Sequence, residues 1–394
     1  MSAVAGPRVG PALALIGAFP FPYPPGSQIF MADQARALAR AGARPTLFTY
    51  GRGQGDAPAD LRLAAPPRWA SPTAMRSGPQ LAKPFADVAL LATWLRAARG
   101  GFAFVLAHNA EAALIALAAR RWTGVRVVYV AHTILRHELS AYADERWRPV
   151  LDRVGGGIDR LIARHADAIV TLGDEPRREL EPLARAPVAV LPPGHDPLPT
   201  PARRVIDEIC ARHHLEPQGF ILYAGNLDRY QDLDLLVAAA GRLPDPAPTV
   251  VIATHDANSA GASLGPGRAT PGRLRVVEVG SFDEMRTLIH AAHSLVLTRR
   301  RTGGFPIKLL NYMEAARPIV AFADVAPGLR DGESARLLDR DDGAAALARI
   351  LAELWTDPDL CSRLGAGARR HLESHHDWAR IADRTLAFLA DLER

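Results

Sequence analysis

The feature that most constrains this chain is a regular alternation of short apolar runs with longer helical segments. In the first half, strands are predicted at Ala12–Gly17, Pro45–Tyr50, Phe104–Ala107, Val125–Val130, Ala168–Leu172 and Val188–Leu191. The helices predicted between them are Phe30–Ala41, Asp87–Ala98, Ala110–Arg121 and a segment through Asp159–Arg164. Strands that alternate with helices form parallel βαβ units, whose sheet is covered by helices on both faces. The first half is therefore predicted to be an α/β domain.

A proline-rich stretch, Leu191–Pro201, interrupts this alternation and is the predicted linker between two domains. The alternation then restarts, with strands predicted at Phe220–Ala224, Thr249–Ala253, Arg275–Glu278, Ser294–Leu297 and Pro318–Phe322. Helices are predicted at Asp232–Gly241, Asp283–Ala292 and Ile307–Ala316, and they dominate from Gly343 to the end. A length of 394 residues suits two domains with separate cores. Because open parallel sheets bind ligands at the carboxyl ends of their strands, we expect an enzyme with its substrate between the halves.

Composition excludes several other classes of protein. Hydrophobic residues make up 48% and charged residues 23%, which is ordinary for a soluble globular protein and excludes a disordered chain. A net charge of +5 is too small to indicate a nucleic-acid partner at this length. Cys210 and Cys361 lie far apart and indicate neither a disulfide framework nor a metal site. No apolar run reaches the ~18 residues of a transmembrane helix, and the first run lacks the flanks of a signal peptide. We expect a cytoplasmic protein.

Two glycine turns follow predicted strands and precede predicted helices. Gly26 and Ser27 end a proline-rich loop, and backbone amides at the start of a helix favour anions such as phosphate. The alternative is that Ser27 simply caps the helix. Gly225 opens the second turn, Gly225–Asp232, which is another place where a phosphate could be held. The spacing of this second turn alone does not identify a ligand.

Two histidines stand at the carboxyl ends of predicted strands. His108-Asn109-Ala110-Glu111 follows one strand, and His132 follows the next. Because the carboxyl ends of parallel strands meet at one edge of a sheet, these side chains are candidates for contact with a ligand. The alternative is that each histidine is an ordinary packed and hydrogen-bonded residue.

The densest basic stretch, Arg299–Lys308, lies between a predicted buried strand and a helix and contains a Gly-Gly turn. Its three arginines together with Lys308 would suit phosphate oxygens. Lysine occurs only at positions 83 and 308, so arginine supplies 45 of the 47 basic side chains. A lysine retained against this bias suggests that Lys308 is needed as a compact ammonium. The alternative is a solvated surface loop.

Several segments together carry a family pattern. They are Pro25-Gly26-Ser27, His108-Asn109, Tyr129-Val-Ala-His132, Asp167-Ala-Ile-Val, Leu191-Pro-Pro-Gly-His-Asp, Tyr223-Ala-Gly-Asn, Val279-Gly-Ser-Phe, Gly304-Phe-Pro-Ile-Lys-Leu-Leu-Asn-Tyr-Met, Arg317-Pro-Ile-Val, Asp357-Pro-Asp-Leu and His376-Asp-Trp378. With them the chain resembles, nearly end to end, the GT-B glycosyltransferases, and specifically the retaining, sugar-nucleotide-dependent enzymes of family four.

The resemblance implies two Rossmann-like domains that face a central cleft, with acceptor binding in residues 1–195 and donor binding in residues 196–375. Residues 376–394 would form a helix that crosses back to the first domain. Gly26 would lie near the donor phosphates and the acceptor, His132 would contact the transferred sugar, and Gly280 and Ser281 would lie near the nucleotide base. Neither a cofactor nor a metal ion is implied, and the expected donor is a UDP- or GDP-linked sugar.

The chain departs from the family's pattern in the expected donor site. The arginine and lysine that grip the donor diphosphate are replaced by Asn226 and Gln231, and two glutamates by Gly303 and Asn311. Each lost cation forfeits charge-assisted hydrogen bonds of ~1.5–3 kcal/mol. In one interpretation, the relocated basic stretch holds a nucleotide sugar and Asn311 binds the ribose. In the other, the donor needs fewer cations and is a sugar phosphate, a lipid-linked sugar or a nucleoside monophosphate sugar.

The predicted site combines these assignments. Catalytic roles in sugar transfer with retention are expected for Gly26, Ser27, His132 and Lys308. Donor binding is predicted for Gly225, Asn226, Arg229, Gln231, Gly280, Ser281, Arg299, Arg300, Arg301, Gly303, Gly304, Phe305 and Asn311. Acceptor binding is predicted for Lys83, His108, Asn109 and Glu111. Two other classes stay open: a degenerate sugar-binding protein, and an epimerase of sugar nucleotides.

The acceptor is expected to be a small molecule or a lipid. The irregular stretch Leu61–Lys83 and the amphipathic segment Pro84–Arg99, which contains Trp94 and Arg96, present aromatic and basic residues. One interpretation is peripheral contact with an anionic membrane at its inner face. The other is a helix that packs on the sheet.

Overall fold

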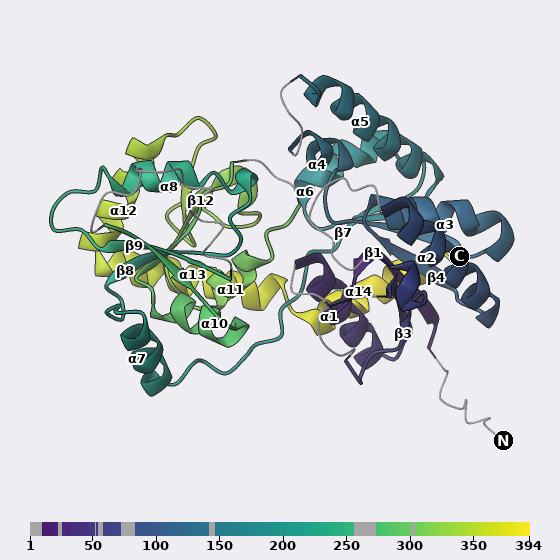
Figure 1. Ribbon diagram of the computed structural model, residues 1–394, viewed down its shortest axis with the longest axis horizontal. Coiled ribbons are helices and arrows are strands. Elements are labelled where there is room, and N and C mark those ends of the chain that lie inside the picture. The colour runs from purple at the N-terminus through teal and green to yellow at the C-terminus, as the bar shows by residue number, and fades with distance from the viewer. Residues whose placement is uncertain are drawn as a thin grey trace. The chain divides into compact units, whose positions relative to one another are not determined.

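The computed structural model describes residues 10–22, 26–51, 53, 58–71, 83–141, 146–255, 273–300 and 304–394. The chain divides into two units (Figure 1). The first unit comprises Met1–Gly194, Gly303–Phe305 and Asp377–Arg394, and the second comprises His195–Thr302 and Pro306–His376. The boundary between Gly194 and His195 falls inside the proline-rich stretch.

The first unit is built on a sheet of parallel strands. These are β1 (Ala12–Pro20), β2 (Arg44–Tyr50), β3 (Leu63–Ala64), β4 (Phe104–His108), β5 (Arg126–Ala131), β6 (Ala168–Thr171) and β7 (Val188–Val190). They pair in the order β3-β2-β1-β4-β5-β6-β7. Its helices are α1 (Gly26–Arg40), α2 (Lys83–Ala97), α3 (Ala110–Thr123), α4 (Leu135–Ala141), α5 (Arg148–His165), α6 (Asp174–Leu180) and α14 (Trp378–Asp391). The order in which strands are added to the sheet reverses between β1 and β4. Open α/β sheets bind ligands at such a switch point.

The core of the first unit lies on both faces of the sheet, because successive side chains of β1 point to opposite faces. Ala14 and Ile16 join one cluster of buried residues with side chains of α2, α3 and α5. Within this cluster Trp94 has no exposed surface, and its ring lies 5.2 Å from that of Phe48, edge to face. Trp94, which the sequence offered for membrane contact, therefore belongs to the core. On the opposite face, α1 packs on β1 and β2.

The second unit repeats the arrangement. Its strands are β8 (Phe220–Ala224), β9 (Thr249–Thr254), β10 (Leu274–Glu278), β11 (Ser294–Leu297), β12 (Ile319–Phe322) and β13 (Arg336–Leu338). They pair in parallel in the order β10-β9-β8-β11-β12-β13. Its helices are α7 (Arg203–Arg212), α8 (Leu233–Ala240), α10 (Phe282–Ala291), α11 (Lys308–Glu314), α12 (Ala344–Thr356) and α13 (Pro358–His375). The switch point lies between β8 and β11, so the predicted α/β class with two Rossmann-like domains is confirmed.

The structure differs from the predicted elements in two instructive places. Helix α1 begins at Gly26, before the predicted start at Phe30, and the pattern of apolar residues misses its first turn since the buried residue there, Gln28, is polar. Ser27 therefore lies in the first turn of the helix and does not cap it. Helix α5 extends back to Arg148 through Gly155, where a Cβ would lie 2.6 Å from the backbone of Arg136 in α4. This glycine permits close helix packing, although in sequence it resembles a helix breaker.

A buried carboxylate holds the proline-rich stretch onto the second unit. Glu314 of α11 is 1% exposed and accepts a hydrogen bond of 3.0 Å from the backbone N–H of Leu198. It also pairs with Arg286 at 3.0 Å and with His195 at 3.1 Å. Arg286 in turn donates to the carbonyl oxygens of Leu198 and Pro199. Burial alone would raise the pKa of Glu314, but these basic and amide neighbours hold it well below its ordinary value.

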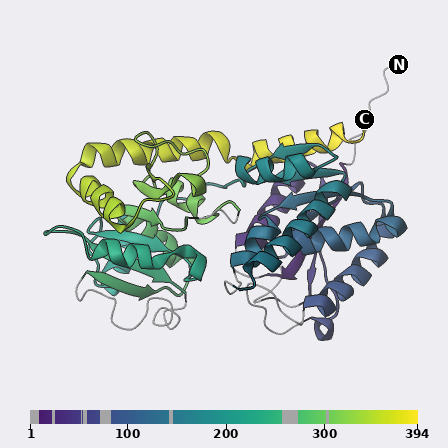
Figure 2. The ribbon, with the colours of Figure 1, turned by 90° about the horizontal axis from the view of Figure 1, so that it is seen from above.

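Helix α14 closes the first unit by packing on α1 (Figure 1 and Figure 2). Its first residue, Trp378, is 2% exposed, and its ring lies 5.6 Å from that of Phe30 in α1. A Cβ at Gly194 would lie 2.3 Å from the Trp378 ring, so the chain passes directly over the indole. Arg384 donates a hydrogen bond of 2.9 Å to the carbonyl oxygen of Val190. Among the residues that the structure describes, no helix is both long and apolar enough to span a bilayer.

Replacing Trp378 with alanine tests this packing. We expect Trp378→Ala to destabilise the first unit by about 3–5 kcal/mol, because it removes a buried aromatic side chain and leaves a cavity. Urea denaturation followed by circular dichroism measures the effect. The matched control is Trp122→Ala, because Trp122 is 73% exposed on α3 and its loss should change stability little. Equal destabilisation by the two variants would contradict this account.

Candidate functional site

Strands β4 and β5 bring the two predicted histidines together at the carboxyl edge of the first sheet. His108 is the last residue of β4, and His132 follows directly after β5. The Nδ1 atom of His108 lies 2.8 Å from the Nε2 atom of His132, within hydrogen-bond distance. His108 has no exposed surface, and His132 is 7% exposed. The predicted contact between His108 and an acceptor is therefore not available in this conformation.

The surroundings of this histidine pair keep both rings neutral. The ring of Phe30 in α1 stands edge-on to His132 at 4.9 Å and lies 5.8 Å from His108. Burial lowers the pKa of His132 to about 3. Burial, with a smaller effect from His132, also lowers the pKa of His108 well below its ordinary value. At neutral pH the two rings are therefore uncharged, and one hydrogen bond joins them.

The other predicted acceptor residues lie around the start of α3. Asn109 has a φ of +95° and caps the helix, since its side-chain oxygen accepts a hydrogen bond of 2.9 Å from Ala112 N–H. Lys83, at the start of α2, pairs with Glu111 in the first turn of α3 at 2.9 Å. Contact of these residues with an acceptor stays a prediction.

Two glycines of the predicted site border the first unit's sheet edge. Gly26 opens α1 directly before Ser27, and both are partly buried. Gly304, which belongs to the first unit, has a φ of +104°, and a Cβ there would lie 1.8 Å from the carbonyl oxygen of His132. Glycine is therefore required at position 304 for both conformation and space.

In the second unit, the turn after β8 is closed by an amide network. The side-chain oxygen of Asn226 accepts a hydrogen bond of 2.6 Å from Gln231, and its nitrogen donates to Asp228 at 2.6 Å. The Tyr223 hydroxyl donates to the carbonyl oxygen of Asn226 at 2.6 Å. Asn226 and Gln231, which replace the family's two cations, thus stabilise the turn with neutral groups. Arg229 lies in the short 3-10 helix Arg229–Gln231 of the same turn.

Lys308 reaches this turn from the first residue of α11. Its ammonium donates a hydrogen bond of 2.9 Å to the Tyr223 hydroxyl and lies 4.2 Å from the centre of the Tyr223 ring. A Cβ at Gly225 would lie 2.5 Å from the Lys308 nitrogen, so the ammonium sits directly against the glycine. Burial, together with the charge of Arg299 and against the opposing effect of Asp228, lowers the pKa of Lys308 to about 7.

The remaining basic residues have different surroundings. Arg299 is 7% exposed just after β11 and lies near enough to Lys308 to repel it. Arg300 instead pairs with Asp232 at 2.8 Å, so its charge is already balanced within the protein. Phe305 and Asn311 are partly buried before and within α11. Arg301 and Gly303 lie outside the described residues.

Gly280 and Ser281, predicted near the nucleotide base, form the cap of α10. The Ser281 hydroxyl accepts a hydrogen bond of 3.2 Å from Glu284 N–H, and the Glu284 carboxylate accepts one of 2.8 Å from Gly280 N–H. The arrangement is similar to a capping box, which the sequence Ser281-x-x-Glu284 predicts, except that the Glu284 carboxylate accepts from Gly280, the residue before the N-cap. Contact of either residue with a base stays a prediction.

Two tyrosines of the second unit belong to the site but were not predicted from the sequence. Tyr223 positions Lys308, as described above, and the Tyr312 hydroxyl accepts a hydrogen bond of 2.9 Å from Ala224 N–H at the end of β8. Tyr312 thereby fastens α11, and with it Lys308, to the sheet edge. The available signal was that each tyrosine brings a hydroxyl into an otherwise apolar run.

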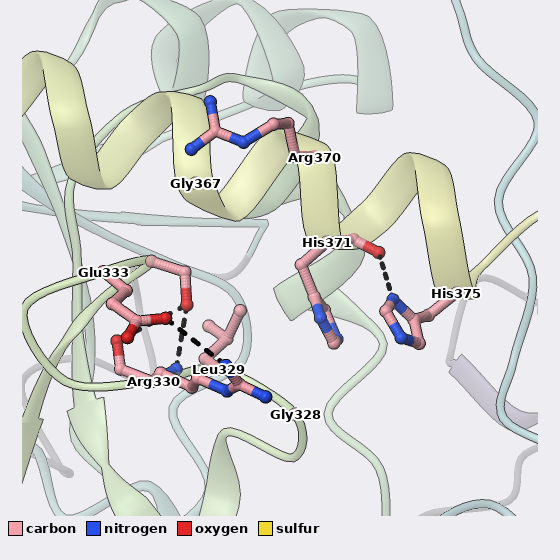
Figure 3. A pocket seen from close by; sticks show the side chains of 9 residues that line it. Gly328, Leu329, Arg330, Glu333, Gly367, Arg370, His371 and His375 are labelled. Atoms are coloured by element: carbon pink, nitrogen blue, oxygen red, sulfur yellow. Dashed lines mark hydrogen bonds and ion pairs between the residues drawn. The ribbon is translucent and has the colours of Figure 1, made fainter.

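A pocket of about 650 Å³ lies elsewhere in the second unit (Figure 3). It is lined by Gly328, Leu329, Arg330, Glu333, Ser334, Gly367, Arg370, His371 and His375. The His371 and His375 rings stack with centroids 4.3 Å apart, and burial, with smaller effects from His375, His376 and Arg330, lowers the pKa of His371 to about 4. None of the predicted site residues that the structure describes lines this pocket. Within the described ranges, no group of three or more metal-ligating side chains is arranged to hold a metal ion.

Comparison with known proteins decides the family. Residues 25–197 match Glycosyltransferase Family 4, and residues 218–357 match Glycosyl transferases group 1. The chain belongs to the family-four-like GT-B glycosyltransferases. It is 29% identical, over 66% of its length, to a D-inositol 3-phosphate glycosyltransferase of Streptomyces scabiei. It spans 61% of that protein's length.

Solved structures of other proteins share the fold. Sucrose-phosphate synthase from Thermosynechococcus elongatus superimposes with a TM-score of 0.76 at 18% identity, over 97% of this chain and 99% of that structure. HepE from Anabaena, solved in complex with UDP-glucose, superimposes with a TM-score of 0.70 at 15% identity, over 97% of this chain and all of that structure. These likenesses extend the family's two-domain architecture to nearly the whole chain.

The stability of Lys308→Met tests the environment of the ammonium. A lysine with a pKa near 7 in the folded state and about 10.4 in the unfolded state destabilises the fold fully below pH ~7, and this cost disappears as pH rises toward ~10. We expect Lys308→Met to be more stable than the parent by on the order of 1–3 kcal/mol at neutral pH, since loss of the Tyr223 hydrogen bond offsets part of the gain. The difference should shrink with rising pH in urea denaturation.

Lys83→Met is the matched control. Burial opposes the charge of Lys83, but the neighbouring Glu111 carboxylate outweighs it and raises the pKa of Lys83. Removing this lysine should therefore make the protein slightly less stable at neutral pH, the opposite sign to Lys308→Met. A loss of stability in both variants would refute the assigned environment of Lys308.

Proposed function

We propose that the chain is a retaining glycosyltransferase that takes its sugar from a nucleoside diphosphate donor held by the second unit. The observation that carries the proposal is the position of the Lys308 ammonium at the carboxyl edge of the second sheet, where it lies against Gly225 and Tyr223 and Arg299 helps to lower its pKa. Lys308 and Arg299 both follow β11 in the chain, and Lys308 reaches back to the end of β8 through Tyr223. They thus flank the switch point at which such sheets bind ligands.

Electrostatics favours an anionic ligand at this edge. The partly buried ammonium of Lys308, whose pKa is lowered by desolvation and by a neighbouring cation, gains most when a negative charge approaches it. A diphosphate brings such charge and accepts charge-assisted hydrogen bonds, each contributing about 1.5–3 kcal/mol. Binding would raise the pKa of Lys308, and the protein would take up a proton from solution above pH ~7.

These two cations take the place of the pair that the family carries in the turn after β8. Asn226 and Gln231 bond to one another and bring no cation to that turn, and Arg300 pairs with Asp232. Lys308 lies against the same turn at Gly225. This favours the interpretation in which a relocated basic group holds a nucleotide sugar over the one in which the donor needs fewer cations.

The comparisons favour a uridine nucleotide and a phosphorylated cyclitol acceptor. HepE was solved with UDP-glucose, and the Streptomyces relatives are named D-inositol 3-phosphate glycosyltransferases. We therefore propose a UDP-linked sugar as donor and make D-inositol 3-phosphate the first acceptor to test. The first unit would bind the acceptor. A cytoplasmic location stays a prediction.

The proposed reaction divides the work between the two units. Lys308 and Arg299 would stabilise the charge that develops on the leaving phosphate, which is the largest contribution expected in such a transfer. His132, neutral at physiological pH, would hydrogen-bond the transferred sugar. Retention would not need a protein nucleophile if the acceptor attacks on the side that the phosphate leaves, with the phosphate taking the acceptor's proton.

Isothermal titration calorimetry with UDP, GDP and CMP tests the donor. We expect UDP to bind more tightly than CMP, and its affinity to fall as pH rises from about 6 to about 9, because Lys308 must be protonated to hold the diphosphate. Lys308→Met should weaken UDP by about tenfold or more and remove this pH dependence. Lys83→Met should leave both unchanged.

Release of UDP from UDP-sugars in the presence of D-inositol 3-phosphate then tests transfer, and the anomeric configuration of the product tests retention. Binding of UDP without product from any acceptor would favour the degenerate sugar-binding alternative. If none of the three nucleotides binds, the nucleoside diphosphate donor is wrong, and the sugar phosphate and lipid-linked donors become the ones to test.

A further inference from the structure

We infer that His108 is a positioning residue that holds the proton of His132 on Nδ1, so that His132 faces its ligand as a hydrogen-bond donor. The assignment of the proton rests on the geometry of the two rings alone. Its consequence for sugar transfer rests on the proposed function.

The first step is the contact between the rings. His108 Nδ1 and His132 Nε2 lie 2.8 Å apart, so one nitrogen must carry a proton and the other must accept it. Two protonated nitrogens would place their hydrogens against one another, and two bare nitrogens would oppose their lone pairs. Because burial lowers the pKa of each histidine, both rings are neutral and each carries a single proton.

The second step is the far nitrogen of His108. Its Nε2 atom is buried and has no hydrogen-bond partner. If His132 donated to His108, the proton of His108 would lie on this Nε2, as a buried N–H without an acceptor. If His108 donates through Nδ1, its Nε2 is a bare acceptor. Orphaned buried N–H groups are rare in proteins, and unsatisfied acceptors are better tolerated.

The third step is the consequence for His132. When its Nε2 accepts from His108, the proton of the neutral His132 ring must lie on Nδ1. His132 Nδ1 makes no hydrogen bond to a residue that the structure describes. It is therefore the ring nitrogen of the two histidines that can bind a ligand. His132 can then donate to an oxygen of the sugar or acceptor, but it cannot act there as a base. The acceptor's proton must go to another group, such as the leaving phosphate.

Packing holds this arrangement in place. Phe30 stands edge-on to His132 with ring centroids 4.9 Å apart, and the same ring contacts His108 at 5.8 Å. The backbone on either side is also fixed, because β4 and β5 pair in register with His108 opposite Val130. Both imidazoles are thus packed against the same aromatic ring. The proton is therefore set before any ligand arrives, which is the property a preorganised hydrogen-bond donor needs.

Nuclear magnetic resonance of the ligand-free protein tests the proton directly. In protein labelled with nitrogen-15 at histidine, long-range proton–nitrogen spectra distinguish a protonated from a bare ring nitrogen, and His132→Gln identifies the His132 signals. We expect His132 to be protonated on Nδ1 and bare on Nε2. Protonation of His132 on Nε2 would overturn the inference, whatever the protein's activity.

Two substitutions of His108 separate positioning from simple packing. His108→Asn keeps a side-chain N–H close to the position of Nδ1 and should keep the His132 proton on Nδ1. His108→Phe fills the space without a donor and should give a mixture of His132 tautomers. An unchanged His132 tautomer in His108→Phe would overturn the positioning role. If this variant does not fold, the parent spectrum and His108→Asn decide the question.

Kinetics then measures the consequence for transfer. We expect His108→Phe to lower kcat by about tenfold or more with little change in donor KM, and His108→Asn to recover most of the loss. Equal kcat in His108→Phe and the parent would overturn the catalytic consequence. Absence of all transferase activity in the parent would instead refute the proposed function and leave the proton assignment to the spectra.

Discussion

Parallel pairing of every strand is the constraint on which the rest of this structure depends. Parallel neighbours need a crossover connection, usually a helix, so that all carboxyl ends in a sheet share one edge. In both sheets the strand order reverses at the centre, between β1 and β4 and between β8 and β11. At such a point the loops that follow the two central strands run to opposite sides of the sheet, and a crevice forms between them that backbone and polar side chains can line. The candidate site residues lie at the carboxyl ends of the strands: His108 ends β4, His132 follows β5 and Gly225 follows β8. Lys308 of α11 lies against Gly225.

Polar groups at the carboxyl edges of the two sheets are accommodated in different ways. On the first sheet, two imidazoles withdraw from water, stay neutral and satisfy one another across 2.8 Å. On the second, the Lys308 ammonium lies against Gly225, and burial and the charge of Arg299 lower its pKa to about 7. A neutral pair offers a directed hydrogen bond, and a cation with a lowered pKa offers affinity for an anion. These are the properties that a sugar and its leaving phosphate would require.

The sequence predicts the sheets well because apolar strands alternating with helices leave few other arrangements. It does not predict short edge strands such as Leu63–Ala64, whose pairing depends on the neighbouring strand more than on their own residues. Nor does it predict contacts set by register. The sequence placed His108 and His132 at the same edge, but their direct hydrogen bond depends on how β4 and β5 align. The paired roles of Arg300 and Glu314 likewise arise from residues distant in the chain.

The retention of lysine at position 308 now has a physical reason. Arginine supplies 45 of the 47 basic side chains, so substitution at this site would be the easy outcome of the chain's composition. Yet the ammonium lies between the Tyr223 hydroxyl and the α-carbon of Gly225, where even a methyl group would approach its nitrogen to 2.5 Å. A guanidinium is planar and wider than an ammonium, and its pKa does not fall toward neutrality when buried. A lysine therefore supplies here a compact cation whose charge can change near neutral pH in response to a ligand.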